Sequence, residues 1–302
     1  MATPMTADQA LTQLKKWGIK YVEIPGWKTH NRNSKGPWGP VNGFIWHHTG
    51  ATVAASNAKS YAASTLYNGL ATLPGPLCQF SIGADGIVYL VGWGRANHAG
   101  GGDPAVLQHV INEDYTGQLK PTRGNSNGTD GNAHFYGVEI QYSGSKPMAD
   151  VQYKAALKLS AAILDFHGWT EKSVIGHGEW SNDKWDPGYA SNKIMAMPTV
   201  RADVKTTRAA GPGGAVQPSP SKPPAKEDTG MPTAAEIAAA VMEYQIDDPR
   251  TEGTKYVPAK SVLWWAGADA AQANSKVRDL EAQVQNLTTL VERLVAANIQ
   301  GK

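Results

Sequence analysis

An α/β layered domain, in which a central mixed β-sheet is flanked by helices, is the fold that the sequence predicts for residues 1–208. Three observations predict it. Apolar runs at Phe44–Trp46 and Phe135–Tyr142 are typical of buried strands. The stretch Asp150–His167 repeats its apolar side chains at helical spacing. Because strands and helices alternate along the chain, a sheet with helices packed against it is the architecture that buries both.

Local signals place the individual elements. Thr6 and Gln9 have the spacing of a capping box, which marks a helix start. Ala84-Asp85-Gly86 lies between two apolar runs, as in a hairpin. Gly168 after the longest helix is a stop signal. In chain order we predict a helix over Thr6–Trp17, a loop over Tyr21–Pro40, a strand ending at His47-His48, a helix over Ser56–Leu70 and strands over Leu77–Ile82 and Ile87–Val91. These are followed by a loop with a short helix over Asp103–Gly131, a strand over Phe135–Tyr142 and a helix over Asp150–His167.

Composition excludes several classes of protein. The chain has 302 residues, a length typical of about two domains. Lys and Arg number 28 against 26 Asp and Glu, so charge gives no reason to expect nucleic acid or an anionic membrane as a partner. The single cysteine, Cys78, excludes an intrachain disulfide and fits a reducing compartment. We expect no signal peptide and no membrane insertion, since neither pattern is found in the sequence.

The composition changes after residue 208. Residues 209–230 contain GPGG and PSPSKPP, which cannot bury a core and predict a linker. Residues 231–302 are predicted to form a helical C-terminal region. Within it, Trp264 and Trp265 indicate a ligand-binding surface, whereas a heptad pattern indicates a homo-oligomer through a coiled coil over Val277–Leu294. The heptad positions are Val277, Leu280, Val284, Leu287, Val291 and Leu294.

Two separated segments carry the residues expected to bind a metal. The Gly/Pro-rich stretch IGHGEWSNDKWDPG contains His177, Lys184 and Asp186, and the apolar strand at 44–46 is followed by His47 and His48. Neutral imidazole and carboxylate are ligands that zinc accepts, and a catalytic zinc takes three protein ligands and leaves a position for water. Neighbouring side chains on a strand point to opposite faces, so only one of the two adjacent histidines can face the site.

These motifs resemble those of the zinc-dependent N-acetylmuramoyl-L-alanine amidases, a family that includes phage endolysins, bacterial wall-recycling amidases and peptidoglycan recognition proteins. The matching residues, in family order, are His47-His48-Thr49, Gly137-Val138-Glu139, His177, Lys184 and Asp186. The resemblance spans roughly Gly43 to Gly188. It implies a peptidoglycan hydrolase, most like a phage endolysin, that uses zinc-activated water to cleave the amide bond between N-acetylmuramic acid and L-alanine. It also implies that the protein stays in the host cytoplasm until lysis and then reaches the cell wall.

Roles follow from the resemblance and from residue chemistry. We expect His47, His177 and Asp186 to bind Zn²⁺, Glu139 to act as the base and Lys184 to face the oxyanion. A carboxylate within an apolar run, as at Glu139, is costly to bury unless it is paired, protonated or near a metal. The residues expected to contact substrate are Asn97, His98 and His48. Some phage members place a tyrosine near the zinc where this chain has Cys78, which leaves proton transfer to Glu139.

Three alternatives remain open at this point. The domain could bind peptidoglycan without cleaving it, although the third expected ligand, Asp186, is present. Cys78 could be a nucleophile paired with a histidine, although a lone cysteine in an apolar strand is more often a small core residue. The C-terminal region could bind the cell wall, form oligomers or do both.

Overall fold

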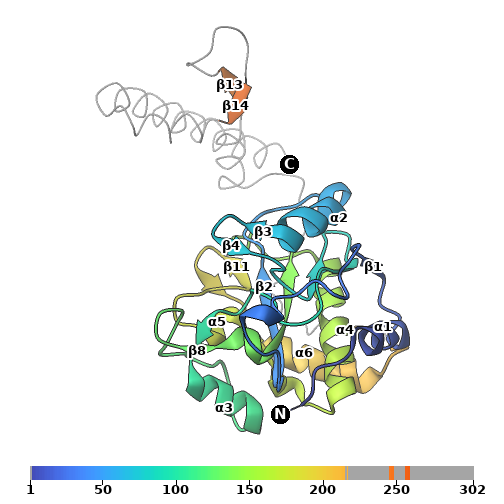
Figure 1. Cartoon of the computed structure of the whole chain (residues 1–302), viewed down its shortest axis with the longest axis vertical. Helices are drawn as coiled ribbons and strands as arrows, with labels where there is room; N and C mark the ends of the chain where they lie inside the picture. The colour runs from blue at the N-terminus through green and yellow to red at the C-terminus, as the bar shows by residue number, and fades with distance from the viewer. Residues whose placement is uncertain (1, 215, 217–244, 248–255, 259–302) are drawn as a thin grey trace, which may run out of the picture. The chain divides into compact units, whose positions relative to one another are not determined.

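The computed structural model describes residues 2–214, 216, 245–247 and 256–258 (Figure 1). The chain divides into two units, Met1–Pro223 and Pro224–Lys302. The first contains a six-stranded sheet in the order β1-β6-β5-β9-β2-β10 with helices against it, which confirms the predicted fold class. The sheet consists of β1 (Tyr21–Glu23), β2 (Gly43–His48), β5 (Phe80–Ile82), β6 (Val88–Leu90), β9 (Phe135–Ile140) and β10 (Val174–Gly176).

Shorter elements surround this sheet. The helices are α1 (Ala7–Lys16), α2 (Ala58–Tyr61), α3 (Pro104–Asn112), α4 (Asp150–His167), α5 (His177–Trp180) and α6 (Met197–Ala210), with the π-helical turn η3 (Ala62–Leu66) and 3-10 turns η1 (Asn33–Lys35), η2 (Ala55–Asn57), η4 (Gly131–Ala133) and η5 (Glu171–Ser173). Two-stranded pairs join β3 (Gly69–Leu70) to β4 (Leu73–Pro74), β7 (Gly101–Gly102) to β8 (Thr129–Asp130), and β11 (Gly188–Ala190) to β12 (Lys193–Ile194).

The direction of the strands decides where functional groups meet. β10, β2, β9 and β5 are parallel neighbours, whereas β6 runs antiparallel to β5 and β1 runs parallel to β6. Their carboxyl ends therefore lie along the same edge of the sheet. In the register, His47 of β2 lies opposite Glu139 of β9, which lies opposite Ser81 of β5. Trp46 lies opposite Gly176, the residue before His177. Four strands thus deliver polar side chains to one edge.

Alternation along the strands separates two faces. Phe44, Trp46 and Val138 pack in one large core with residues of α1, α4 and α6. Ile45 and Phe135 point the other way and pack in a cluster with residues of α3. A third cluster joins Cys78 to apolar residues of α2 and η3. His47 lies two residues after Ile45 on β2, and Glu139 lies four residues after Phe135 on β9, so each points to the same side as that residue. Both therefore lie on the second face, which carries α3 and the α2/η3 segment.

Most predicted elements are confirmed, with local corrections. α4 has the predicted bounds and ends at Gly168 in the left-handed region, and the capping box of Thr6 and Gln9 is present at α1. The helix predicted over 56–70 is present as an unbroken helical segment over residues 55–68, which contains a 3-10 turn and a π-helical turn, and residues 69–70 form β3 instead. The loop predicted over 21–40 begins with β1, and α6 was not predicted.

A buried ion pair holds α5, which carries His177, against α6. Glu179 is fully buried and accepts hydrogen bonds from Arg201 at 2.8 and 3.1 Å. Its carboxylate also accepts from the backbone N–H groups of Leu119 and Gly176, at 2.9 and 3.2 Å. A buried charge is tolerated when it is paired and hydrogen-bonded in this way. The position of His177 therefore depends on contacts from three separate segments.

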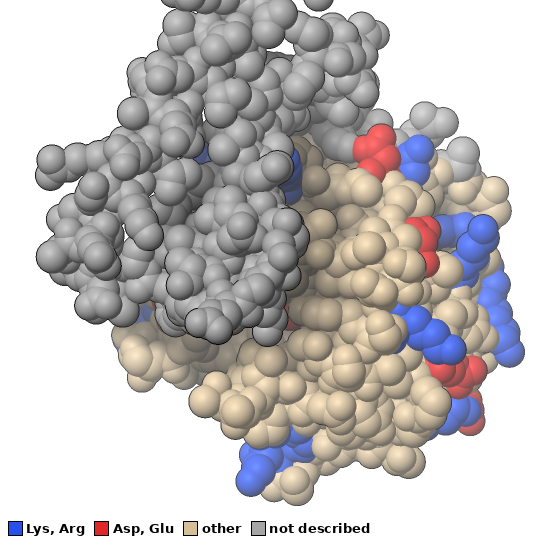
Figure 2. Space-filling view, turned by 90° about the horizontal axis from the view of Figure 1, so that it is seen from above, with Lys and Arg blue, Asp and Glu red and all other residues tan. Residues whose placement is uncertain are grey.

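The C-terminal unit is described only at β13 (Gln245–Asp247) and β14 (Tyr256–Pro258), which form an antiparallel pair. Trp264, Trp265, the coiled coil predicted over Val277–Leu294 and most of the linker lie outside the described residues. Within the described residues no helix has the length and apolarity to span a membrane. Figure 2 shows Lys and Arg interspersed with Asp and Glu on the visible face of these residues, as the near-balanced composition predicts.

Candidate metal centre

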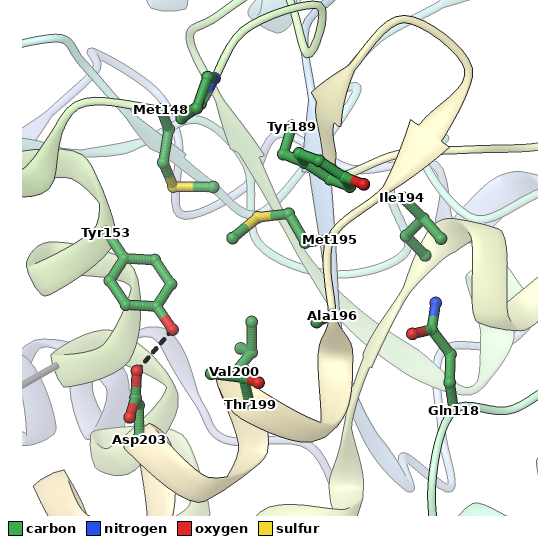
Figure 3. A pocket seen from close by; sticks show the side chains of 11 residues that line it. Gln118, Met148, Tyr153, Tyr189, Ile194, Met195, Ala196, Thr199, Val200 and Asp203 are labelled. Carbon is green, nitrogen blue, oxygen red and sulfur yellow. Dashed lines mark hydrogen bonds between the residues drawn. The ribbon is translucent and has the colours of Figure 1, made fainter. Parts of the chain in front are cut away.

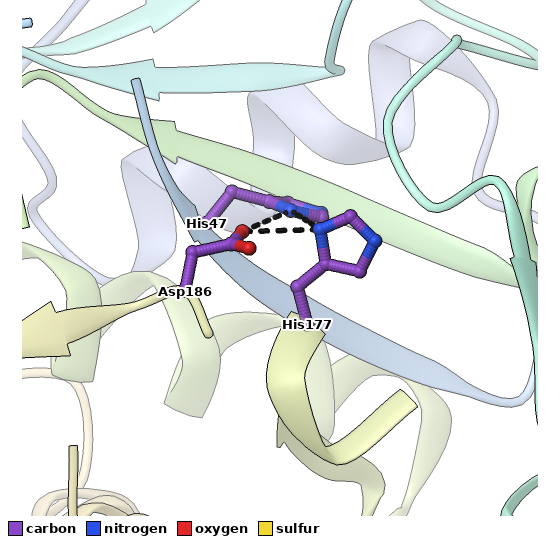
Figure 4. A group of neighbouring side chains, drawn as sticks. All are labelled: His47, His177 and Asp186. Carbon is purple, nitrogen blue, oxygen red and sulfur yellow. Dashed lines mark hydrogen bonds and ion pairs between the residues drawn. The ribbon is translucent and has the colours of Figure 1, made fainter. Parts of the chain in front are cut away.

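Three elements bring two histidines and an aspartate together. His47 lies at the end of β2, His177 is the first residue of α5 and Asp186 lies in the loop before β11 (Figure 4). Because β10 pairs with β2, the residue after β10 emerges beside His47. The Asp186 loop is held by a hydrogen bond from the Gly178 N–H to the Asp186 carbonyl oxygen, 2.8 Å long. The three predicted ligands therefore converge, although 139 positions separate the first from the last.

The facing atoms form a nearly equilateral triangle. His47 Nδ1 lies 3.0 Å from His177 Nδ1 and 2.9 Å from Asp186 Oδ2, and His177 Nδ1 lies 3.1 Å from Asp186 Oδ2. His47 and His177 are buried, with 1% and 5% of their surface exposed. Ligands on zinc bonds of about 2.0–2.1 Å would lie about 3.3 Å apart in a tetrahedron. The triangle therefore has close to the dimensions that a zinc ion requires.

The outer hydrogen bonds of the rings determine which nitrogen is free to bind. His177 Nε2 lies 3.1 Å from the Ala99 carbonyl oxygen, which can only accept, so Nε2 donates. His98 Nε2 likewise donates to the Phe135 carbonyl oxygen at 3.3 Å, which leaves His98 Nδ1 to accept from His47 Nε2 at 3.0 Å. In a neutral imidazole one nitrogen carries the proton and the other a lone pair. Both Nδ1 atoms of the triangle are therefore lone-pair atoms when the rings are neutral.

The electrostatic environment keeps these groups in their metal-binding forms. Burial, and then the nearby His177, lowers the pKa of His47 to about 4, so its imidazole is neutral at pH 7. Burial would raise the pKa of Asp186, but its contacts with His177 and His47 hold that pKa well below its usual range. Two lone pairs and a carboxylate oxygen thus face one another, an arrangement that a cation stabilises. This trio is the one group of three potential ligands found among the described residues.

Glu139 lies beside this trio, on the neighbouring strand. Its Cα pairs with that of His47, so both side chains leave the same face of the sheet. The Oε2 atom of Glu139 is buried, and no described residue forms a hydrogen bond with it. Burial, reinforced by the charge of Asp186, raises the pKa of Glu139 well above its usual range, whereas Lys184 lowers it. A nearby cation would favour the ionised carboxylate. A buried carboxyl oxygen without a hydrogen-bond partner fits a site that can take up a cation.

Lys184 and His48 lie near the trio but have different contacts. The Lys184 charge acts on both Glu139 and His47, lowering their pKa values, and no hydrogen bond or ion pair is found for its ammonium group among the described residues. His48 points away from His47, as the strand alternation predicts. Its Nδ1 accepts a 2.9 Å hydrogen bond from the Gly188 N–H, and its ring packs edge-on against Trp185. His48 therefore supports the loop that carries Asp186.

The residues expected to contact substrate lie in different settings. His98 is only 7% exposed and lies behind His47, with both ring nitrogens engaged inside the protein. Asn97 is half-buried and donates to the Pro74 carbonyl oxygen at 3.1 Å. Contact of these residues with substrate stays a prediction. The positioning of His98 against a trio histidine was not foreseen, because sequence spacing gives no information on which residues meet across the sheet.

Cys78 does not have the environment of a nucleophile. It is fully buried in the cluster with α2 and η3, and burial raises the pKa of its thiol well above the usual value. Reactive cysteines are partly exposed and have a lowered pKa, since the thiolate is the nucleophile. The structure therefore favours the core role of Cys78 that was weighed from the sequence.

A separate apolar hollow of about 460 Å³ lies under the β11–β12 hairpin (Figure 3). Met148, Met195 and Ile194 line it, and a 2.8 Å hydrogen bond joins Tyr153 to Asp203 on one side. The trio does not line this hollow. This hollow therefore does not mark the candidate site, which is identified by the convergence of polar groups.

Fold and site together define a class of protein: a mixed sheet presents a histidine–histidine–aspartate trio and a half-buried glutamate at the ends of parallel strands. Residues 37–189 match the family model of the N-acetylmuramoyl-L-alanine amidases. This chain belongs to that family, and the matched range contains the whole trio and Glu139.

Solved structures that resemble this chain include an endolysin amidase and a peptidoglycan recognition protein. The endolysin amidase LysCS from Clostridium intestinale URNW is 16% identical, with 57% of this chain and 88% of that chain covered and a TM-score of 0.33. Drosophila peptidoglycan recognition protein SD is 16% identical, with coverage of 57% and 90% and a TM-score of 0.37. No curated protein matches the sequence. Membership therefore rests on the match over residues 37–189.

We expect the metal-free protein to lose stability in mild acid. The pKa of His47 falls from 6.5 to about 4 on burial, so between these values the unfolded chain binds a proton that the folded chain does not. Stability then decreases as the pH falls, by up to about 3 kcal/mol for this one group. Urea unfolding in the presence of a chelator, between about pH 7 and about pH 4, measures this. A His47→Gln variant is the control and should show a weaker pH dependence. A free energy of unfolding that does not change over this interval would contradict the assignment.

Proposed function

We propose that this protein is a peptidoglycan hydrolase that cleaves the amide bond between N-acetylmuramic acid and L-alanine, with Zn²⁺ held by His47, His177 and Asp186. The observation that carries the proposal is the triangle of two lone-pair nitrogens and one carboxylate oxygen beside the orphaned Oε2 atom of Glu139. Zinc held in such a site would lower the pKa of a bound water to about 7 and would polarise a carbonyl.

Three residues around the trio have separate roles in the proposed reaction. Glu139 takes the proton of the attacking water and passes it to the leaving amine, a transfer typically worth about 10²–10⁴ in rate. Its ionised form is favoured by Lys184, the nearby cation. Lys184 stabilises the negative charge that develops on the carbonyl oxygen, a contribution of roughly 3–4 kcal/mol for one well-placed donor. His48 holds the Asp186 loop in place through Gly188.

The alternative is a module that binds peptidoglycan without cleaving it. Binding alone does not require a carboxyl group buried without a partner, and such a group costs stability. Strongly perturbed carboxyl groups are more common where proton transfer takes place. The state of Glu139 therefore favours the enzyme over the binding module.

We also propose that the protein acts as an endolysin, in the host cytoplasm until lysis and then on the cell wall. Residues 1–208 would be the catalytic domain, 209–230 a linker and 231–302 a region that binds the wall, forms a homo-oligomer through Val277–Leu294, or both. Only the resemblance and the sequence patterns support this organisation. Sedimentation of the full chain tests the oligomer, since a strict monomer would contradict the coiled coil.

Digestion of purified sacculi tests the proposed reaction. We expect mass spectrometry of the soluble products to show glycan with a free lactyl group and stem peptide with a new L-alanine amine. The activity should disappear on treatment with a zinc chelator and return with added zinc, and thiol alkylation should leave it unchanged. Binding to sacculi without any new L-alanine amine would support the binding module instead.

Replacing the proposed base separates catalysis from metal binding. Glu139→Gln keeps the size of the side chain but cannot accept the water proton, so we expect turnover to fall by about 10²–10⁴. Zinc content, measured on the same sample by atomic absorption, should remain near one per chain because Glu139 is not a ligand. Cys78→Ala is the matched control and should retain activity. Near-normal turnover of the glutamine variant would remove Glu139 from the mechanism.

A further inference from the structure

Both trio histidines are held from behind by the same short segment of chain. His47 Nε2 donates to His98 Nδ1, and His177 Nε2 donates to the carbonyl oxygen of Ala99, the next residue. Neither residue of this segment belongs to the strands or the loop that carry the trio. Because an outer hydrogen bond fixes both the tautomer and the rotation of an imidazole, His98-Ala99 sets the direction of both lone pairs.

This segment is in turn held by a single side-chain oxygen. Asn132 Oδ1 accepts hydrogen bonds from the backbone N–H groups of His98 at 2.9 Å, Ala99 at 2.8 Å and Gly100 at 3.4 Å. Asn132 is buried, with 7% of its surface exposed. The Gly131 N–H, one residue earlier, donates to the Gly100 carbonyl oxygen at 2.8 Å. The segment is therefore clamped from two adjacent positions.

The surface of the sheet leaves a space for the ring of His98. A Cβ atom placed on Gly137 would lie 2.4 Å from His98 Nδ1, closer than such atoms approach in proteins. Gly137 belongs to β9, two residues before Glu139 and on the same face. Because Gly137 has no side chain, the ring of His98 can lie against β9, where His98 Nδ1 reaches His47 Nε2.

We propose that Asn132 is a positioning residue of the metal site, which orients both imidazoles through the His98-Ala99 segment without touching the metal. The proposal rests on the proposed function, since it requires that the trio binds zinc. It assigns a role to a residue that lies 85 positions after His47 and 45 before His177 in the sequence. Without the Asn132 oxygen, three backbone N–H groups lose their acceptor and the segment loses its fixed distance from both rings.

Zinc affinity of the full-length chain, measured by competition with a chromophoric chelator, tests the proposal. We expect Asn132→Ala to weaken zinc binding by at least about tenfold, as is typical for loss of an outer contact of metal ligands. Asn132→Asp keeps an acceptor oxygen at the same place and should bind zinc nearly as well as the unaltered chain. Asp103→Ala is the matched control, because the Asp103 carboxylate also accepts from backbone N–H groups, those of Ala105 and Thr122, but holds neither ring.

A second readout separates orientation from general loss of stability. In the metal-free protein, ¹⁵N chemical shifts of the histidine rings should show His47 and His177 with the proton on Nε2, and Asn132→Ala should mix the two tautomers while Asp103→Ala does not. If Asn132→Ala does not fold, His98→Phe replaces it, since this variant removes the acceptor for His47 directly and should weaken zinc binding by a similar factor.

The outcomes distinguish this proposal from the proposed function. Zinc binding by Asn132→Ala, or by His98→Phe in its place, that equals that of the unaltered chain would overturn the positioning role alone. An equal weakening in Asp103→Ala would also overturn it, since general destabilisation would then explain the effect. Absence of zinc binding by the unaltered chain would overturn the proposed function, and this proposal with it.

Discussion

Three hydrogen-bond acceptors that face one another without a hydrogen between them are the constraint on which the site depends. Two imidazole nitrogens and a carboxylate oxygen lie about 3 Å apart, and the outer hydrogen bonds of each ring direct its proton to the far side. In water each of these atoms would be solvated. A cation bound between them would relieve their mutual repulsion, so the geometry of the folded chain makes this trio a candidate metal site.

The fold maintains this arrangement through the order of its strands. β2 lies between β9 and β10, and all three run parallel, so the residues at or after their carboxyl ends are neighbours in space. The large core with α4 and α6 fixes one face of the sheet, and the site occupies the other. The buried Glu179–Arg201 pair holds α5, and His48 holds the aspartate loop. The proposed chemistry therefore depends on contacts that the reacting groups themselves do not make.

The sequence predicted the convergence of His47, His177 and Asp186 better than it predicted the residues that support them. His47, His177 and Asp186 are recognisable because imidazole and carboxylate in strand-end and loop positions are chemically unusual, and strand alternation correctly turned only one of the two adjacent histidines toward the site. The role of Asn132 and the burial of His98 could not be predicted, because they depend on which backbone groups meet across the sheet. The run Asp130-Gly131-Asn132 signals a turn, but nothing in it indicates which N–H groups the asparagine binds.

X-ray absorption at the zinc edge of the purified protein tests the central claim most directly. The account predicts one zinc per chain with only nitrogen and oxygen neighbours at about 2.0–2.1 Å, two of them with the multiple-scattering pattern of imidazole. Zinc with a sulfur neighbour at about 2.3 Å, or with no imidazole signature, would contradict it, because the metal would then be bound by groups other than the trio.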